Sequence, residues 1–214
     1  MPTLSEAESK RMLAAHGVPV LDERSASSTA GAVDAAEEIG YPVVLKLCGR
    51  AIAHKTERGL VRLGLGDADA VATAAAALLA AATPDDGDVE LLVAPMARGT
   101  RELIAGLVRD DQFGPAVMLG VGGVLAEAVR DVAFRLVPLS PVDADDLVDD
   151  LAAQALLGPF RGEPSLDRGA MRDLLLGLSR LAESDPSVRA VDVNPLLLVD
   201  GRPVALDALV EVAP

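Results

Sequence analysis

The chain has 214 residues, of which 50% are hydrophobic and only 2% aromatic, and its 33 acidic against 19 basic residues give a formal net charge of −14. This length and apolar content predict a globular protein with a sizeable core and exclude a disordered chain. The acidic balance argues against a nucleic-acid interface and against adhesion to an anionic membrane, because both require clustered positive charge.

Cysteine usage and the apolar runs indicate the compartment. A single cysteine, Cys48, cannot form an intrachain disulfide, which favours a reducing environment. The first fifteen residues carry four charged side chains and no apolar signal-peptide core. The longest uncharged run, 70–84, has fifteen residues, whereas a bilayer helix needs about 20. We therefore expect a soluble cytoplasmic protein with no membrane partner.

Helix and strand patterns alternate in the first half of the chain. Ser5 with Glu8 three residues later is typical of a helix start, and Gly17 is typical of a helix end. Short runs of aliphatic and β-branched residues predict strands, and the aperiodic stretch 48–59 predicts a loop. The expected helices are 4–16, 28–39 and 68–82, and the expected strands are 41–47, 60–65 and 89–95.

The second half of the chain shows a different pattern of predicted elements. Four strand-like pieces separated by Gly, Asp and Arg suggest an antiparallel sheet, at 100–110, 114–123, 124–129 and 131–139. Helices are expected over 143–156 and 166–182, and Asp200-Gly201 predicts a hairpin with a further strand beyond it. These elements predict an α+β protein of two lobes with a hinge near 93–97.

Several familiar site signatures are absent from the sequence. There is no Gly-Lys pair for a Walker loop, and the dinucleotide pattern starting at Gly120 fails because its last glycine would fall on Leu125. Two histidines and one cysteine without a cluster argue against a structural zinc site, and no GxSxG motif supports a serine nucleophile.

The positions of the lysines are more informative. The chain has three lysines against sixteen arginines, and Lys46 lies inside the apolar strand pattern PVVLKL. It is either a lysine that faces water from an edge strand or snorkels to it, or a point charge placed to hold a phosphate. His54 and Lys55 lie in the aperiodic loop with Arg50 and Arg58. That loop is either a solvated basic segment or a local positive patch of the kind that a polyphosphate requires.

A second group of candidate residues is acidic. The segment VDVNPLLL places Asp192 and Asn194 on one face of a strand, and Asp207 follows across the hairpin. Oxygens from adjacent strands would suit Mg²⁺, which takes further ligands from water and phosphates; an ordinary turn at Asn194-Pro195 is the alternative. Glu102 and Glu127 are single acids in apolar strand patterns, each either an outward-facing residue or a ligand.

Taken together, these pieces resemble the ATP-grasp domain, or β-type subunit, of the NDP-forming acyl-CoA synthetases. That family includes ADP-forming acetate–CoA ligase and is related to the succinyl-CoA synthetase β subunit. The resemblance extends over nearly the whole chain, and its most specific stretches are PVVLKL, HKTERGLV, ELIAGLVRDDQFGPAVMLGVGG, DVAFRLVPL and DVNPLLL. It implies an ATP-grasp fold across 1–214, with a small lobe at about 18–94, a large lobe at about 95–214 plus helix 4–16, and a nucleotide cleft between the two α/β lobes.

The resemblance also implies roles in nucleotide binding and phosphate transfer. Lys46 matches the strand lysine that contacts the nucleotide phosphates, and His54 matches a histidine that becomes phosphorylated on a mobile loop and relays phosphate. The segment 92–96 matches the hinge that reads adenine through its backbone, where we expect the Ala94 carbonyl and the Met96 amide to bond the base edge. Pro95 lacks only an N–H that would be unused there.

Four acidic or amide residues complete the implied site. Glu102 matches a nucleotide-contacting acid, and Glu127 lies where the phosphate side of the cleft is expected. Asn194 and Asp207 match the Mg²⁺ ligands. The sequence departs from the family pattern at Leu60, where a second glycine is usual, and at Ala94, where the succinyl-CoA synthetase relatives carry a glutamate.

The implied reaction is acyl-CoA + ADP + phosphate ⇌ acid + CoA + ATP, run with a separate CoA-binding α partner that carries the first phosphohistidine. This chain would bind ATP or ADP with Mg²⁺ and be inactive alone. One alternative is a non-catalytic regulatory ATP-grasp domain of a multidomain protein acetyltransferase. Another is a carboxylate–amine ligase without a histidine relay.

Overall fold

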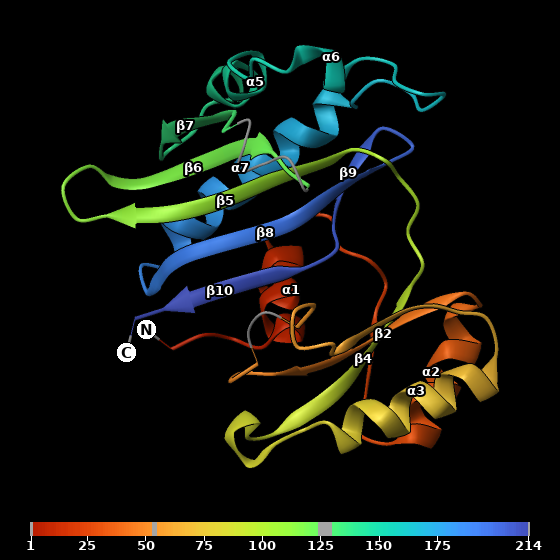
Figure 1. Ribbon diagram of the computed structural model, residues 1–214. Helices are drawn as coiled ribbons and strands as arrows, with labels where there is room; N and C mark the ends of the chain where they lie inside the picture. The colour runs from red at the N-terminus through yellow and green to blue at the C-terminus, as the bar shows by residue number, and fades with distance from the viewer. Residues whose placement is uncertain (1, 53–54, 124–129, 214) are drawn as a thin grey trace. The chain divides into compact units, whose positions relative to one another are not determined.

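The structure is a computed structural model that describes residues 2–52, 55–123 and 130–213. The chain divides into two compact units. Unit 1 comprises Met1–Leu4, Glu8–Val20 and Arg98–Pro214, and unit 2 comprises Ser5–Ala7 and Leu21–Ala97. Each unit combines one antiparallel sheet with helices (Figure 1), so the predicted α+β class is confirmed.

Unit 2 is built on a four-stranded sheet in the order β1-β4-β2-β3. The strands are β1 (Arg24–Ala26), β4 (Val89–Pro95), β2 (Val43–Gly49) and β3 (Val61–Leu65). Helices α2 (Thr29–Ile39) and α3 (Ala68–Ala80) and the short helix η1 (Pro84–Asp86) complete the unit. Every residue of β2, Lys46 included, is buried, which fits the central place of this strand in the sheet.

Small side chains let the two helices of unit 2 pack closely. The buried positions of α2 are all alanine, and α3 buries two alanines with Val71 and Leu78. Each helix begins at a side-chain cap, where Ser28 Oγ accepts from the Gly31 amide and Asp67 Oδ1 accepts from the Ala70 amide. An aromatic-poor chain can thus fill this core with alanine and aliphatic residues.

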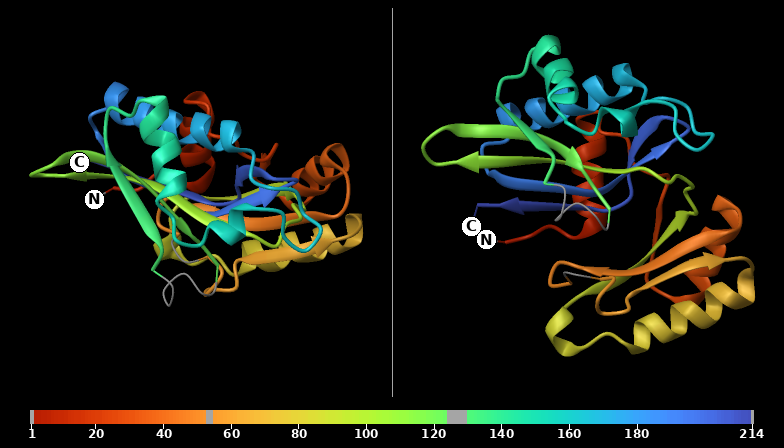
Figure 2. Two further views of the ribbon diagram at one scale, coloured as in Figure 1. Left: turned by 90° about the horizontal axis from the view of Figure 1, so that it is seen from above. Right: turned by 45° about the horizontal axis from the view of Figure 1, so that its top comes forward.

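Unit 1 is built on a larger sheet, which has six strands among the described residues. Five of them lie in the order β10-β8-β5-β6-β7, and β9 pairs with β8. The strands are β5 (Glu102–Asp110), β6 (Gly114–Val121), β7 (Val132–Leu136), β8 (Val188–Val199), β9 (Arg202–Ala205) and β10 (Ala208–Val212). The helices are α1 (Glu6–Ala15), which belongs to this unit from Glu8 onward, α5 (Pro141–Asp149), α6 (Gln154–Leu157) and α7 (Arg168–Ser184). Helices α5 and α7 lie on one side of this sheet (Figure 2).

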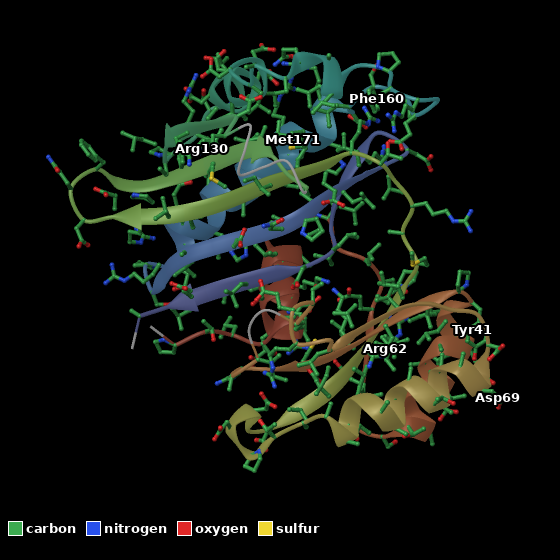
Figure 3. The ribbon with its side chains drawn as sticks, viewed as in Figure 1. Tyr41, Arg62, Asp69, Arg130, Phe160 and Met171 are labelled. Atoms are coloured by element: carbon green, nitrogen blue, oxygen red, sulfur yellow. The ribbon has the colours of Figure 1, made fainter. Side chains whose placement is uncertain are left out.

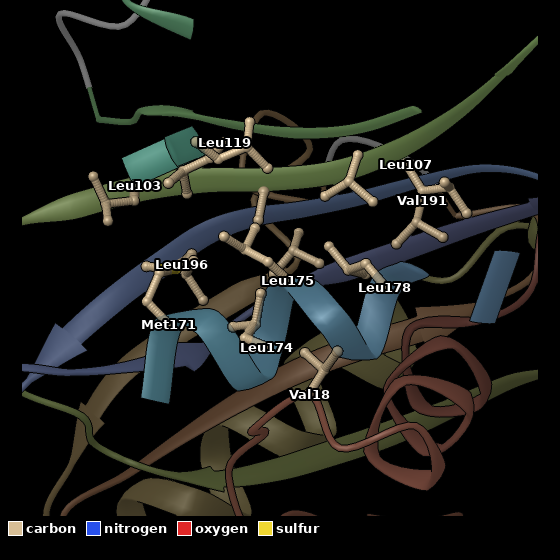
Figure 4. Packing of buried hydrophobic residues seen from close by; sticks show 14 of the residues in the cluster. Val18, Leu103, Leu107, Leu119, Met171, Leu174, Leu175, Leu178, Val191 and Leu196 are labelled. Carbon is tan, nitrogen blue, oxygen red and sulfur yellow. The ribbon is translucent and has the colours of Figure 1, made fainter. Parts of the chain in front are cut away.

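The core of unit 1 forms between α7 and the sheet. Met171, Leu174, Leu175 and Leu178 recur at helical spacing on α7 and are fully buried. Figure 4 shows them facing side chains of the sheet, including Leu107 of β5. Strand side chains alternate in direction, so on β5 the buried residues Leu103, Ala105 and Leu107 face α7. The residues between them point to the opposite face of the sheet.

The long strand β8 forms the predicted hairpin with β9. Asp200 and Gly201 both have positive φ, 49° and 81°, as a type I′ turn requires. A Cβ at Gly201 would lie only 2.4 Å from the Ser165 carbonyl oxygen, so this position accepts only glycine. The strand beyond the hairpin, β10, pairs antiparallel with β8 as predicted.

The helix expected over 143–156 is wrong in extent. Helix α5 ends at Asp149, and α6 begins at Gln154. The Asp131 carboxylate accepts hydrogen bonds from the Ala152 and Ala153 amides, and the Gln154 side chain donates to the Val148 and Leu151 carbonyls. These side chains satisfy the backbone groups at both helix ends, so a break costs little there. The strand expected over 124–129 lies outside the described residues.

A buried arginine holds the segment that follows α6. Arg101 Nε donates to Glu163 at 3.1 Å, Nη1 donates to the Leu156 and Gly158 carbonyls, and Nη2 donates to the Pro164 carbonyl. In the same segment the Arg161 guanidinium lies 5.3 Å from the centre of the Phe160 ring. No helix in the described part of the chain is both long and apolar enough to span a membrane.

Candidate functional site

Lys46 lies on the central strand β2 of unit 2, between β4 and β3. Its side chain is 11% exposed, and its Nζ donates to Glu6 Oε1 at 2.6 Å. An ammonium in this position needs a counter-charge, because burial without one is costly. The alternative of an edge-strand lysine facing water is therefore wrong, and Lys46 is a buried, ion-paired lysine.

Lys55 reaches the same carboxylate from the segment after β2. Its Nζ lies 3.0 Å from Glu6 Oε2, and the Cys48 Sγ lies 3.5 Å from that oxygen. The Glu6 side chain is 1% exposed. No sequence pattern singles out Glu6, although a buried lysine signals that some acid must pair with it. Glu6 is separated from Lys46 by 40 residues, so only the folded chain identifies this acid among 33.

Arg58 of the predicted loop is also paired, with a different acid. Its Nη1 and Nη2 donate to the two oxygens of Asp86 at 2.7 and 3.0 Å. Asp86 is buried and accepts further hydrogen bonds from the Thr83 amide and hydroxyl. Two basic residues of the loop, Lys55 and Arg58, are thus paired with carboxylates within unit 2, and Arg58 remains exposed at the surface.

The Arg58–Asp86 pair leads to a pH-dependent prediction. Hydrogen bonds from Arg58 and Thr83 hold the pKa of Asp86 well below its usual range. Such a group contributes stability above its unfolded pKa of about 3.9 and loses that contribution as the pH falls toward the folded value. We expect the Tm of the wild type to fall more steeply than that of Asp86→Asn between about pH 5 and pH 2. Equal slopes in thermal melts over this range would contradict the prediction.

The expected base-binding segment lies at the end of β4. Ala94 is buried and pairs with Val44 of β2, whereas the pairing of β4 with β1 ends at Val93. The Met96 amide donates to the Pro42 carbonyl at 3.1 Å. In this structure that amide is therefore engaged within unit 2, and a base edge would have to replace or share its bond.

Glu102 begins β5 of unit 1 and is exposed. Its carbonyl accepts from the Gly122 amide at 2.9 Å, which brings the GVGG segment against it. A Cβ at Gly122 would lie 2.8 Å from the Leu103 carbonyl oxygen, so the close approach requires glycine. The Glu102 carboxylate thus lies beside a glycine-rich turn. Glu127 and His54 fall outside the described residues.

Asn194 and Asp207 lie opposite each other in unit 1. Ala208 pairs with Val193, and the Leu206 amide donates to the Pro195 carbonyl at 3.0 Å, so Asp207 falls across from Asn194. Asn194 and Pro195 also form a bulge against β5, which interrupts the register and redirects the strand. The sheet therefore brings together the amide and the carboxylate that were predicted to be neighbours.

Asp192 adds a second carboxylate on the same face of β8, two residues from Asn194. Its pKa is raised because the surrounding protein desolvates the carboxyl and because Asp207 repels its negative charge. A divalent cation would relieve this repulsion, and oxygen donors of this kind fit Mg²⁺. Among the described residues there is no group of three or more His, Cys, Asp or Glu side chains that could hold a metal ion.

The third lysine, Lys10, supports the same region of unit 1. It is 3% exposed, and its Nζ donates to the Leu206 carbonyl at 2.6 Å, immediately before Asp207. The neighbouring Ser9 hydroxyl accepts from the Val210 amide. These contacts from α1 hold the chain where β9 passes into β10. No sequence pattern distinguishes Lys10 from the other charged residues of this helix.

Comparisons with known proteins agree with this fold. The model of the ATP-grasp domain matches residues 2–212. The chain is 33% identical over 208 residues to the β subunit of acetate–CoA ligase [ADP-forming] I from Pyrococcus furiosus, covering 96% of this chain and 90% of that subunit. It is 36% identical over 203 residues to acetate–CoA ligase [ADP-forming] I from Archaeoglobus fulgidus, covering 94% of this chain but only 30% of that protein.

A solved structure extends the comparison. The dinucleotide-forming acetyl-coenzyme A synthetase 1 of Candidatus Korarchaeum cryptofilum, in complex with coenzyme A and Mg-AMPPCP, superposes with a TM-score of 0.85 at 35% identity, covering 99% of this chain and 93% of that chain. Its phosphohistidine segment points towards the nucleotide binding site. The chain belongs to the ATP-grasp family and is a homologue of the β subunits of ADP-forming acetate–CoA ligases. The predicted resemblance and the ATP-grasp fold are therefore confirmed.

Proposed function

We propose that this chain is the nucleotide-binding subunit or domain of an ADP-forming acyl-CoA synthetase. The observation that carries the proposal is the buried Lys46 ammonium on β2, in a chain that aligns over 96% of its length with such a β subunit. An ammonium is a point charge suited to phosphate, and lysine in this position would neutralise charge on the nucleotide. Units 2 and 1 would be the small and large lobes.

The remaining residues take roles by the same proposal. Asn194 and Asp207 would hold Mg²⁺, which neutralises phosphate charge when bound. Glu102 and Glu127 would contact the nucleotide, as would the backbone of Ala94 and Met96. His54 would accept a phosphoryl group from a phosphohistidine of a CoA-binding α-type partner and pass it to ADP.

The fraction of each relative's length that this chain covers supports the need for a partner. The chain corresponds to most of a separate β subunit in Pyrococcus furiosus but to less than a third of the Archaeoglobus fulgidus ligase. We infer that CoA binding and the first phosphohistidine belong to another subunit or domain, without which this chain would not turn over acyl-CoA.

The proposal predicts nucleotide binding that depends on Lys46. Titration calorimetry with ADP and Mg²⁺ should show binding by the wild type, weakened about 10- to 100-fold in Lys46→Ala. The reason is that a charge-assisted contact is worth about 1.5–3 kcal/mol. Arg62→Ala is the matched control, because it removes a positive charge from the neighbouring strand β3 (Figure 3).

Two outcomes would count against the proposal. Equal affinities of Lys46→Ala and wild type would remove Lys46 from the site. Absence of nucleotide binding by the folded wild type would favour the non-catalytic regulatory domain instead.

A further inference from the structure

Glu6 is a buried carboxylate with a separate cation on each oxygen. Lys46 Nζ lies 2.6 Å from Oε1, and Lys55 Nζ lies 3.0 Å from Oε2. The three side chains are 1%, 11% and 12% exposed, respectively. They come from the start of α1, from β2 and from the segment before β3. Three distant parts of the chain therefore converge on one carboxylate within unit 2.

We propose that Glu6 is a positioning residue that holds the Lys46 and Lys55 ammonium groups together as one binding site for the phosphate groups of a nucleotide. This inference rests on the proposed function and adds two residues to it, since neither Glu6 nor Lys55 has a role there.

The physical reason is preorganisation. Two ammonium groups on long flexible side chains repel each other, and fixing both next to a ligand costs conformational entropy. A carboxylate that accepts from both of them supplies the attraction and fixes the geometry before the ligand arrives. The nucleotide then meets cations that are already in place.

The choice of lysine at both positions fits this role. An ammonium has three N–H donors, so a lysine that donates one of them to Glu6 is also able to donate to a phosphate oxygen. The arginine of the same loop, Arg58, is bound through both Nη groups to Asp86 instead. Planar, bidentate pairing of that kind commits a guanidinium to a single carboxylate.

The test compares Glu6→Gln and Glu6→Asp with the wild type, and Glu37→Gln serves as the control because Glu37 is an exposed acid on α2 of the same unit. Affinities are measured for ADP with Mg²⁺ and for adenosine, which has no phosphate. We expect Glu6→Gln to weaken ADP binding by about tenfold or more and to leave adenosine binding unchanged. Glu6→Asp should recover part of the loss, and Glu37→Gln should bind as the wild type does.

Each outcome has a distinct meaning. A wild type that does not bind ADP overturns the proposed function. If the wild type binds and Glu6→Gln binds ADP equally well, or loses ADP and adenosine affinity equally, this inference alone is overturned.

A second measurement covers a Glu6→Gln variant that does not fold. Lysine acetylation is mapped by mass spectrometry on the wild type at increasing ADP concentration. Lys46 and Lys55 should become protected together, with the same midpoint. Protection of Lys46 without Lys55 would overturn the inference.

Discussion

Incubation with ATP labelled at the γ-phosphate should transfer label to the wild-type chain, and His54→Ala should acquire about 10³-fold less, because removal of an enzymatic nucleophile costs at least this much. An imidazole nitrogen would attack the γ-phosphorus and form an N–P bond. The bond from that phosphorus to the β–γ bridging oxygen breaks, ADP leaves with the electron pair, and the imidazole proton passes to water. A neutral imidazole is competent for this near pH 7.

The chain offers a matched control for this experiment. It has only one other histidine, His16, whose ring nitrogens hydrogen-bond to the Met12 carbonyl and the Ser184 hydroxyl in unit 1. His16→Ala should therefore keep the label. Acid-labile label that persists in His54→Ala, or that disappears in His16→Ala, would contradict the histidine relay. The proposed phosphorylation step would use only ATP and Mg²⁺, so the experiment is done on the isolated chain.

The largest effect on stability is expected at Arg101. Arg101→Met should lower the free energy of unfolding by about 3–5 kcal/mol, because it breaks a buried ion pair and removes the donors of three backbone carbonyls. Urea unfolding followed by circular dichroism would measure this loss. Since Arg101 precedes Glu102, we also expect weaker nucleotide binding by the variant at temperatures where it remains folded.

Arg202→Met is the control for Arg101. The Arg202 side chain is 74% exposed and lies 3.4 Å from Asp167, and exposed ion pairs contribute at most about 1 kcal/mol. A loss below about 1 kcal/mol in Arg101→Met would contradict the prediction and show that water replaces the guanidinium without cost.

Local patterns in the sequence predicted most of the elements. The alternation of apolar runs with capping residues located α2 and α3, and Asp200-Gly201 located the hairpin of β8 with β9. These signals depend on residues that are near one another in the chain, so they survive without tertiary information. The same local reasoning failed at 150–153, where the helix is interrupted. Asp131, which immediately precedes β7 and is distant in the sequence, accepts hydrogen bonds from the amides of Ala152 and Ala153.

The candidate site divides in the same way. Asn194 and Asp207 were predicted as neighbours because a hairpin defines its own register, and the structure places them opposite each other. The partners of the basic residues could not be predicted: Glu6 for Lys46 and Lys55, and Asp86 for Arg58. Any of 33 acids could have supplied a counter-charge.

Hydrophobic period, turn chemistry and ligand chemistry are local properties, so the fold class, the order of the elements and the residue types suited to phosphate and Mg²⁺ could be predicted from the sequence. The central position of Lys46, the carboxylate that it shares with Lys55 and the hydrogen bond from the Met96 amide to Pro42 could not. Burial and long-range pairing set these contacts, and they exist only after distant segments pack together.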